Sequence, residues 1–226
     1  MLRIGHAGAQ GYVPRNTLAS ISKALELHCD MIEFDVHKAK TGEIVLIHDK
    51  TVNNTTKGNG NVKNLTLKDL KKLDVGDGEK IPTLEEVLNL VAGRSKLNIE
   101  IKAYDATKNV TKIIQSYVAN GAYKYSDFVV SSFNWLALVK IHILNSQIPL
   151  GVLIHTQPLK LAFVLARITN AWAFHPHYKL VDEKMVKKIH NRNMKIFVWT
   201  VDEQKDIQKM KQLKVDGIIT NYPDRV

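Results

Sequence analysis

Two short apolar segments of this sequence carry acidic residues at alternate positions near their ends. Glu33 and Asp35 are separated by one residue, and Glu100 stands two residues before Lys102. Side chains of a strand alternate between its two faces, so each pair shares a face. Three carboxylates close together repel one another and are costly to bury without a compensating cation. Glu33, Asp35 and Glu100 therefore indicate a site for Mg2+ or Ca2+ rather than Zn2+; an internal salt bridge is the structural alternative.

Two histidines follow apolar segments that end near these acids. His6 closes the first apolar segment, and His48 closes the segment after a short turn. The unperturbed pKa of histidine lies near neutrality, so the pair can supply a general acid and a general base. Asp49 either orients His48 or caps a turn. Trp199, near the end of a later segment, either covers the carbon skeleton of a small polyol or packs in a core.

Alternating strand and helix patterns predict the elements that position these side chains. Strands are expected at 2–6, 31–36, 97–102, 127–131, 150–154, 171–175, 195–200 and 216–220, and helices at 18–27, 84–91, 110–118, 185–190 and 204–213. Such alternation implies a parallel α/β sheet, and eight units in this length fit a (β/α)8 TIM barrel. An open doubly wound sheet is the alternative, but no glycine-rich dinucleotide motif supports it.

A ninth apolar segment, 43–47, follows the second predicted strand too closely for a parallel crossover, which needs roughly a dozen residues. We therefore expect a β-hairpin extension after strand 2, turning at Thr41 and Gly42 and carrying His48 back to the barrel rim. The polar segment 50–64, rich in Asn and Gly, is expected to be an irregular loop.

Length and composition favour one barrel domain over residues 1–226, because 45% hydrophobic residues can bury a core without disulfides. The single cysteine, Cys29, and the lack of a signal peptide or long apolar run favour a cytoplasmic protein. A net charge of +10 favours an anionic partner. We expect a small-molecule phosphodiester and not nucleic acid, because no nucleic-acid motif is present. An acidic membrane surface is compatible with the charge, but no amphipathic anchor requires one.

The ordered motifs resemble the glycerophosphodiester phosphodiesterase family, whose pattern reads His-Arg-Gly, Pro-Glu-Asn-Thr, Glu-x-Asp-Val, His-Asp and Glu-x-Lys. The corresponding segments here are 6–8, 14–17, 33–36, 48–49 and 100–102, with further similarity at 198–201 and 216–221. The resemblance covers nearly the whole chain and implies metal-dependent cleavage of glycerophosphodiesters to glycerol 3-phosphate and an alcohol.

By matching position, the resemblance implies that Glu33, Asp35 and Glu100 hold the metal ion. His6 and His48 would exchange protons, and Lys102 would contact phosphate. In the family, a hydroxyl of the glycerol is thought to attack phosphorus and give a cyclic intermediate.

Two residues depart from the family pattern. Ala7 stands where the family has an arginine, and Arg15 stands where it has a glutamate. We hypothesise that Arg15 restores a guanidinium that binds phosphate. The alternative for Arg15 is a solvated loop residue, with catalysis weakened or lost. The alternatives for the function of the whole chain are a catalytically impaired barrel that binds phosphodiesters or a partner, and a lipid-directed enzyme of the lysophospholipase D or sphingomyelinase D kind.

Overall fold

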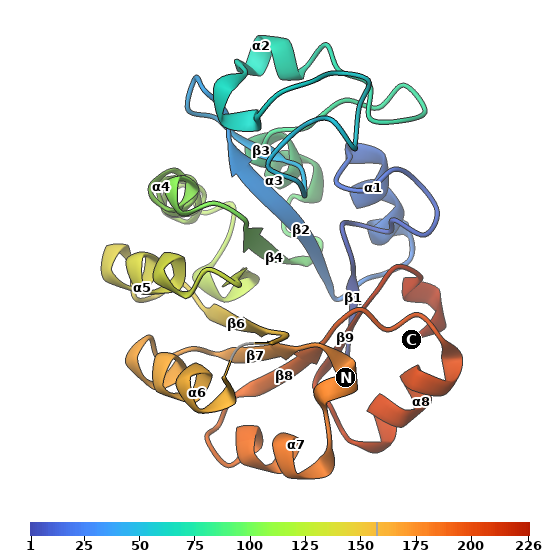
Figure 1. Ribbon diagram of the computed structural model, residues 1–226, viewed down its shortest axis with the longest axis vertical. Helices are drawn as coiled ribbons and strands as arrows, with labels where there is room; N and C mark the ends of the chain where they lie inside the picture. Colours follow the sequence, from blue (N-terminus) through green and yellow to red (C-terminus); the bar gives the residue numbers. More distant parts are fainter. Residues whose placement is uncertain (157) are drawn as a thin grey trace.

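The computed structural model describes residues 1–156 and 158–226, and its strands close into a parallel barrel (Figure 1). The barrel strands are β1 Leu2–Gly5, β2 Met31–Lys38, β4 Lys96–Ile101, β5 Phe128–Ser132, β6 Leu150–Ile154, β7 Ala173–Pro176, β8 Lys195–Val198 and β9 Gly217–Thr220. They are joined in the order β1-β9-β8-β7-β6-β5-β4-β2, and pairing of β1 with β2 closes the ring. The predicted TIM barrel is therefore confirmed, and strand bounds differ from prediction by only one or two residues.

Helices surround the barrel on the outside (Figure 1). They are α1 Leu18–Glu26, α2 Leu67–Leu70, α3 Leu84–Val91, α4 Thr107–Ala119, α5 Trp135–Leu144, α6 Leu159–Ile168, α7 Glu183–His190 and α8 Gln204–Gln212. Thr17 and Thr83 begin α1 and α3 with capping boxes, which satisfy backbone N–H groups that have no partner within the helix. None of the helices in these described ranges is long and apolar enough to cross a membrane.

The predicted hairpin is confirmed. Strand β3, Ile44–Leu46, pairs antiparallel with the end of β2 outside the barrel, with Val36 opposite Leu46. Gly42 occupies the turn at φ +105°, a conformation that side chains with a Cβ rarely adopt. The predicted irregular loop 50–64 contains one bridge, between Thr51 and Asn61, and a short 3-10 turn at Val62–Asn64. This hairpin and the following segment pack over a small core of their own, which includes Val45, Ile47, Val52, Val62, Leu70 and Ile81.

The barrel has an inner core distinct from the large core between strands and helices. Inward side chains of several strands meet there, and they include Ile4, Met31, Val129, Ala173, Phe197 and Ile219. Gly217 is required beside this core, because a Cβ there would lie 2.8 Å from the Phe197 ring and 2.9 Å from Ile4. The polar residues of the site lie nearer the carboxyl ends of the same strands, so the inner core forms the floor beneath them.

Cys29 is buried beneath α1, as expected for a small apolar side chain, with 5% of its surface exposed. Burial raises the pKa of its thiol to about 12, so the thiol stays protonated. A protonated, buried thiol is unreactive, which agrees with a structural role.

His175 on β7 is fully buried, and neither ring nitrogen has a hydrogen-bond partner within the described part of the chain. Its ring packs across Gly151, where a Cβ would lie 2.6 Å away, and 5.2 Å from the Phe197 ring centroid. Burial lowers the pKa of His175 from 6.5 to about 3, because no acceptor compensates the charged form.

Because only the unfolded chain can protonate His175 in mild acid, this residue should lower the stability of the protein as the pH falls. The unfolded chain takes up a proton as the pH falls below 6.5, whereas folded His175 stays neutral down to about 3. The contribution of His175 to the free energy of unfolding is fully present above pH 6.5 and is lost progressively below it, by about 3 kcal/mol near pH 4.5. In a His175→Leu variant, urea unfolding at several pH values should show a shallower decline, and parallel declines in both proteins would contradict the assignment.

Candidate active site

Three carboxylates meet at the carboxyl ends of β2 and β4, where barrel enzymes place their active sites. Parallel pairing sets Glu33 opposite Asn98 and Asp35 opposite Glu100, so all four side chains turn into the barrel. One oxygen from each of Glu33, Asp35 and Glu100 lies within 4.8 Å of the other two. Each of these residues is at most 8% exposed. The structure thus brings together the three acids that the alternation pattern singles out.

The loop after β1 braces two of the acids. Ala7, at φ +46°, donates its backbone N–H to Glu33 Oε2 at 3.0 Å. Asn16 binds Asp35 twice: its Nδ2 donates to Asp35 Oδ2 at 2.9 Å, and its Oδ1 accepts from the Asp35 backbone N–H at 3.0 Å. Glu33 Oε1 is buried and has no hydrogen-bond partner among residues 1–156 and 158–226. That oxygen is held ready for a ligand outside the protein.

Lys102, one residue beyond β4, supplies the positive charge nearest the cluster. Its Nζ lies 2.7 Å from Glu100 Oε1 and 3.3 Å from Asp35 Oδ1. Burial opposes its ionisation, but the two carboxylates outweigh burial and raise the pKa of Lys102, which therefore stays charged. One ammonium cannot balance three ionised carboxylates, so full ionisation of the cluster would need further positive charge.

The pKa values of the acids reflect this imbalance. Burial, followed by repulsion from Asp35, raises the pKa of both Glu33 and Glu100 to about 8. Burial also tends to raise the pKa of Asp35, but Lys102, His48 and the Asn16 hydrogen bond together hold that pKa below its ordinary value. Without further positive charge, Asp35 is the most readily ionised member of the cluster.

His6 is oriented by a chain of hydrogen bonds that ends at Asp202. Asn221 donates its Nδ2 to Asp202 Oδ2 at 2.6 Å, which directs Asn221 Oδ1 towards His6 Nδ1 at 2.7 Å. Gln10 Nε2 also lies 2.7 Å from His6 Nδ1, so Nδ1 is engaged within the protein and Nε2 is the nitrogen on the side of the acids. His6 Nε2 lies 3.9 Å from Glu33 Oε2, at the edge of the acidic cluster.

His48 is held in the same manner from the other side. Its Nδ1 lies 2.7 Å from Asp49 Oδ1, so Asp49 orients the ring, one of the two roles the sequence leaves open. Asn54 donates to the second Asp49 oxygen at 3.0 Å, and the hydrogen bonds from His48 and Asn54 lower the pKa of Asp49. His48 Nε2 is the nitrogen available to a substrate.

A cavity of about 170 Å3 connects these groups. Its lining comprises His6, Glu33, Asp35, His48, Asn98, Glu100, Lys102, Phe133, Leu153, Trp199, Thr200 and Ile219. Trp199 donates its indole N–H to the His175 carbonyl at 2.7 Å and packs edge-to-face with Phe133 at 5.4 Å. The cavity therefore has an acidic side and an aromatic side, as a polar ligand with a short carbon skeleton requires.

Arg15 lies at the rim beside His48 rather than in this lining. Its Nη2 is 4.0 Å from Asp49 Oδ2, and its side chain is 38% exposed. Ala7, by contrast, is buried in the loop that braces Glu33, so its methyl group cannot bind phosphate.

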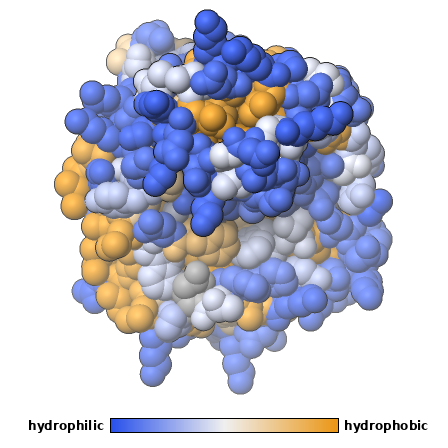
Figure 2. Space-filling model, turned by 45° about the horizontal axis from the view of Figure 1, so that its top comes forward, coloured by the Kyte–Doolittle hydropathy of each residue, from blue (hydrophilic) through white to orange (hydrophobic). Residues whose placement is uncertain are grey.

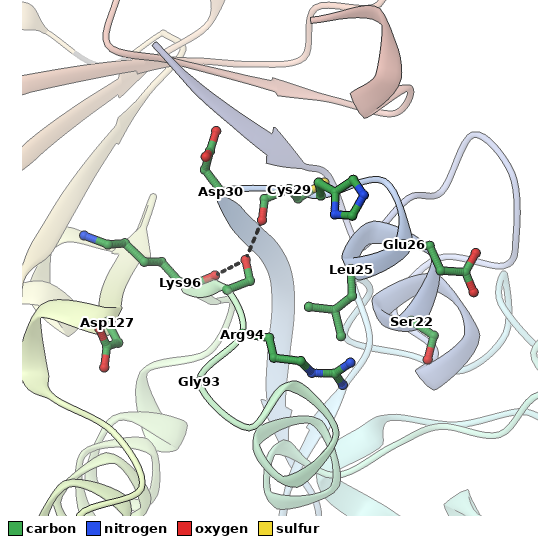
Figure 3. Close-up of a pocket in the computed structure, with 11 residues that line it drawn as sticks. Ser22, Leu25, Glu26, Cys29, Asp30, Gly93, Arg94, Lys96 and Asp127 are labelled. Carbon is green, nitrogen blue, oxygen red and sulfur yellow. Dashed lines mark hydrogen bonds between the residues drawn. The ribbon is translucent and has the colours of Figure 1, made fainter.

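A larger cavity, about 780 Å3, lies at the opposite end of the barrel (Figure 3). Loops that precede β2 and β4 line it, and their polar groups serve to hold those loops together. Ser95 donates to the Cys29 carbonyl at 2.9 Å, and Arg94 donates to carbonyls in the last turn of α3. We regard this cavity as structural, because active sites of barrel enzymes lie at the other end.

Three residues that orient the site carried no role in the sequence analysis: Asn16, Asp202 and Asn221. Asn16 and Asn221 both lie within the motif segments. The sequence of these segments does not show which group each side-chain amide contacts. Asp202 lies in the loop after β8, outside every motif. Its contacts with Thr220 and Asn221 depend on two strands meeting when the barrel closes.

A closed parallel barrel with an acidic pocket and two oriented histidines at the carboxyl ends of its strands defines a TIM-barrel enzyme. Comparison with known proteins identifies the family to which this enzyme belongs. The model of the glycerophosphoryl diester phosphodiesterase family matches residues 6–225, so the chain belongs to that family and is an enzyme. The family resemblance carried by the sequence motifs is confirmed.

Individual relatives are similar to this chain over almost its full length. A glycerophosphodiester phosphodiesterase of Caldanaerobacter subterraneus is 36% identical, covering 99% of this chain and 95% of the relative. One from Bacillus altitudinis is 34% identical, covering 97% and 94%. The solved structure of an Oleispira antarctica phosphodiesterase in complex with the product sn-glycerol-3-phosphate is 26% identical, with a TM-score of 0.89, and the match covers 98% of this chain and 93% of that one.

Removing the Asn16 clamp should weaken both the fold and the site. Asn16→Gly leaves the buried Asp35 with unpaired groups, while glycine tolerates the local φ of +58°. The free energy of unfolding should fall by about 1–3 kcal/mol, and affinity for Mg2+ or Ca2+ by about 10–100-fold. Urea unfolding measures the change in stability, and calorimetric titration with the metal ion measures the change in affinity.

The matched control for this experiment is Asn193→Gly, an exposed asparagine at a similar φ of +57°. It loses the same side chain from the same backbone conformation but touches no acid of the cluster, so its unfolding free energy should change by less than about 0.5 kcal/mol. Equal behaviour of the two variants would show that Asn16 does not support Asp35.

Proposed function

We propose that this enzyme hydrolyses glycerophosphodiesters to glycerol 3-phosphate and an alcohol, with the aid of one divalent metal ion and two histidines. The observation that carries the proposal is the convergence of Glu33, Asp35 and Glu100 within 4.8 Å between His6 and His48. Family membership supports the substrate class, and the Oleispira relative holds sn-glycerol-3-phosphate as its product.

The donor set suits a hard divalent cation. Carboxylate oxygens are the ligands that Mg2+ and Ca2+ prefer, and Glu33 Oε1 is buried without a partner among the described residues. Three ionised carboxylates and the Lys102 ammonium carry a net charge that one divalent ion balances. Glu33, Asp35 and Glu100 would hold the ion, which when bound neutralises phosphoryl oxygens and orients the diester.

The two histidines would move the protons. One accepts the proton of the attacking hydroxyl at Nε2, and the other donates a proton from Nε2 to the oxygen of the leaving alcohol. This division needs both rings to present Nε2 with fixed orientation. The Asn221 and Asp49 contacts at Nδ1 provide that orientation for His6 and His48.

Three further side chains would bind the substrate. Lys102 lines the cavity and is charged, so it can donate to a phosphoryl oxygen while keeping its contact with Glu100. Trp199 would cover the carbon atoms of the glycerol, consistent with its place in the aromatic side of the cavity. Arg15 at the rim would bind the phosphate with its planar guanidinium, in place of the family arginine absent at Ala7.

Metal removal should abolish turnover. In a time course with glycerophosphocholine and glycerophosphoethanolamine, release of glycerol 3-phosphate should stop on addition of a chelator and return with excess Mg2+ or Ca2+. Glu100→Gln removes a carboxylate but keeps the shape of the side chain, and should lower kcat/KM by about 100-fold or more.

Other outcomes of this time course select the alternative functions. Binding of the diesters without turnover would indicate a catalytically impaired barrel. Turnover of lysolipids alone would indicate an enzyme of the lysophospholipase D kind.

Arg15→Ala should raise the KM for the diester and the inhibition constant of inorganic phosphate by about tenfold, equivalent to about 1.4 kcal/mol of binding. Arg15→Lys should recover only part of this loss, because an ammonium lacks the planar fork. Arg94→Ala, at the far end of the barrel, is the control and should leave both constants unchanged. If Arg15→Ala behaved like the control, the idea that Arg15 replaces the family arginine would be wrong.

A further inference from the structure

Helices α5 and α6 expose apolar side chains on the outside of the barrel. Leu136 and Ile143 of α5 are 71% and 76% exposed, and Leu161 and Ile168 of α6 are 56% and 62% exposed. The two helices lie side by side (Figure 1), and apolar atoms gather along the same edge of the molecule in Figure 2. We call this the apolar face; it comprises Leu136, Ile143, Leu144, Leu161, Val164 and Ile168. A continuous exposed apolar surface of this kind marks an interaction site.

The sequence around the apolar face contains no acidic residue. Between Asp127 and Asp182 there is neither Asp nor Glu, although one residue in four of the whole chain is charged. The charged side chains of this stretch are all cations: Lys140, Lys160, Arg167 and Lys179. The partner of this face is therefore one that combines apolar groups with negative charge.

A groove at the edge of the apolar face provides a place for such a charge. It has a volume of about 430 Å3, and Phe163, Val164, Arg167 and Arg192 are among its lining residues. The Arg192 guanidinium lies 4.8 Å from the Phe163 ring centroid, which fixes its plane beside the groove. Two guanidiniums beside an apolar surface match a phosphate group carried on acyl chains.

We propose that the apolar face docks on the surface of an anionic lipid bilayer, with a lipid phosphate between Arg167 and Arg192. Apolar side chains enter the boundary between headgroups and acyl chains, while the cations at the rim contact the headgroups. The face runs along the outside of the barrel and includes none of the residues that line the acidic cavity, so docking leaves the cavity open.

A second copy of the chain is a poorer occupant. A twofold dimer through this face would bring the same surface of both copies together and gather Lys140, Lys160 and Arg167 of both copies in one interface. With no acidic residue in the stretch to pair with them, these cations would repel across the interface. An anionic lipid bilayer provides both apolar chains for the exposed side chains and negative charge for the cations.

Co-sedimentation of the full chain with vesicles tests the proposal. Vesicles of phosphatidylglycerol and phosphatidylcholine in equal amounts, in about 0.1 M salt, should bind the chain about tenfold or more tightly than phosphatidylcholine alone. Leu161→Gln/Ile168→Gln changes no charge and should weaken this binding by about tenfold. Both positions are exposed, so the thermal unfolding temperature should hardly change, which separates lost binding from lost folding.

Two charge variants provide a matched pair. Arg167→Gln/Arg192→Gln and Lys205→Gln/Lys209→Gln each lower the net charge of +10 by two, but the second pair lies on α8, across the barrel from the apolar face (Figure 1). The arginine pair should weaken vesicle binding by about fivefold or more, and the lysine pair by less than about twofold.

Equal losses of vesicle binding in the arginine and lysine variants would show that only the overall charge attracts the chain to the vesicles. That result would overturn the proposal. So would absence of binding to anionic vesicles. A dimer in light scattering that Leu161→Gln/Ile168→Gln dissociates, without vesicle binding, would assign the apolar face to a second copy instead.

Discussion

Buried negative charge is the constraint on which the rest of this structure depends. Glu33, Asp35 and Glu100 lie inside the barrel, almost shielded from water, and ionised carboxylates in that position are unstable without partners. The chain provides the Ala7 N–H, the Asn16 amide and the Lys102 ammonium, each from a segment adjoining β1 or β4. These contacts hold the acids in place but leave the cluster short of positive charge. This deficit of positive charge is the physical basis of the proposed metal site.

The rest of the barrel keeps this arrangement rigid. The inner core of Ile4, Met31, Val129, Phe197 and Ile219 fills the space below the acids, so they have no room to move apart. Loops at the rim then fix the histidines, through Asn221 and Asp202 on one side and Asp49 on the other. Rigid support below the acids and fixed histidine rings above them are the geometry that the proposed acid–base chemistry requires.

Ala7 stands where the family has an arginine, and the loop around it is otherwise intact. Ala7 retains its backbone bond to Glu33, so the loop keeps its bracing role without the side chain. Arg15 stands one residue before Asn16, which binds Asp35, and lies against Asp49, which orients His48. The Arg15 guanidinium therefore lies at the His48 side of the site, which is the basis for the role proposed for it.

The sequence by itself determined the barrel, the hairpin after β2 and the set of acids and histidines, because alternation along a strand fixes which side chains share a face. The predicted helices did not include α5 or α6. The α5 segment WLALVKIHIL has apolar residues around most of its circumference, so helical periodicity gives almost no signal there. The α6 segment does have a buried face of Ala162, Leu165 and Ala166, which the prediction missed. Only the tertiary structure decided that Asn16, Asn221 and Asp202 orient the site, and that Leu136 and Ile143 face outwards. Those contacts and exposures arise when distant segments meet as the barrel closes, which local sequence patterns do not encode.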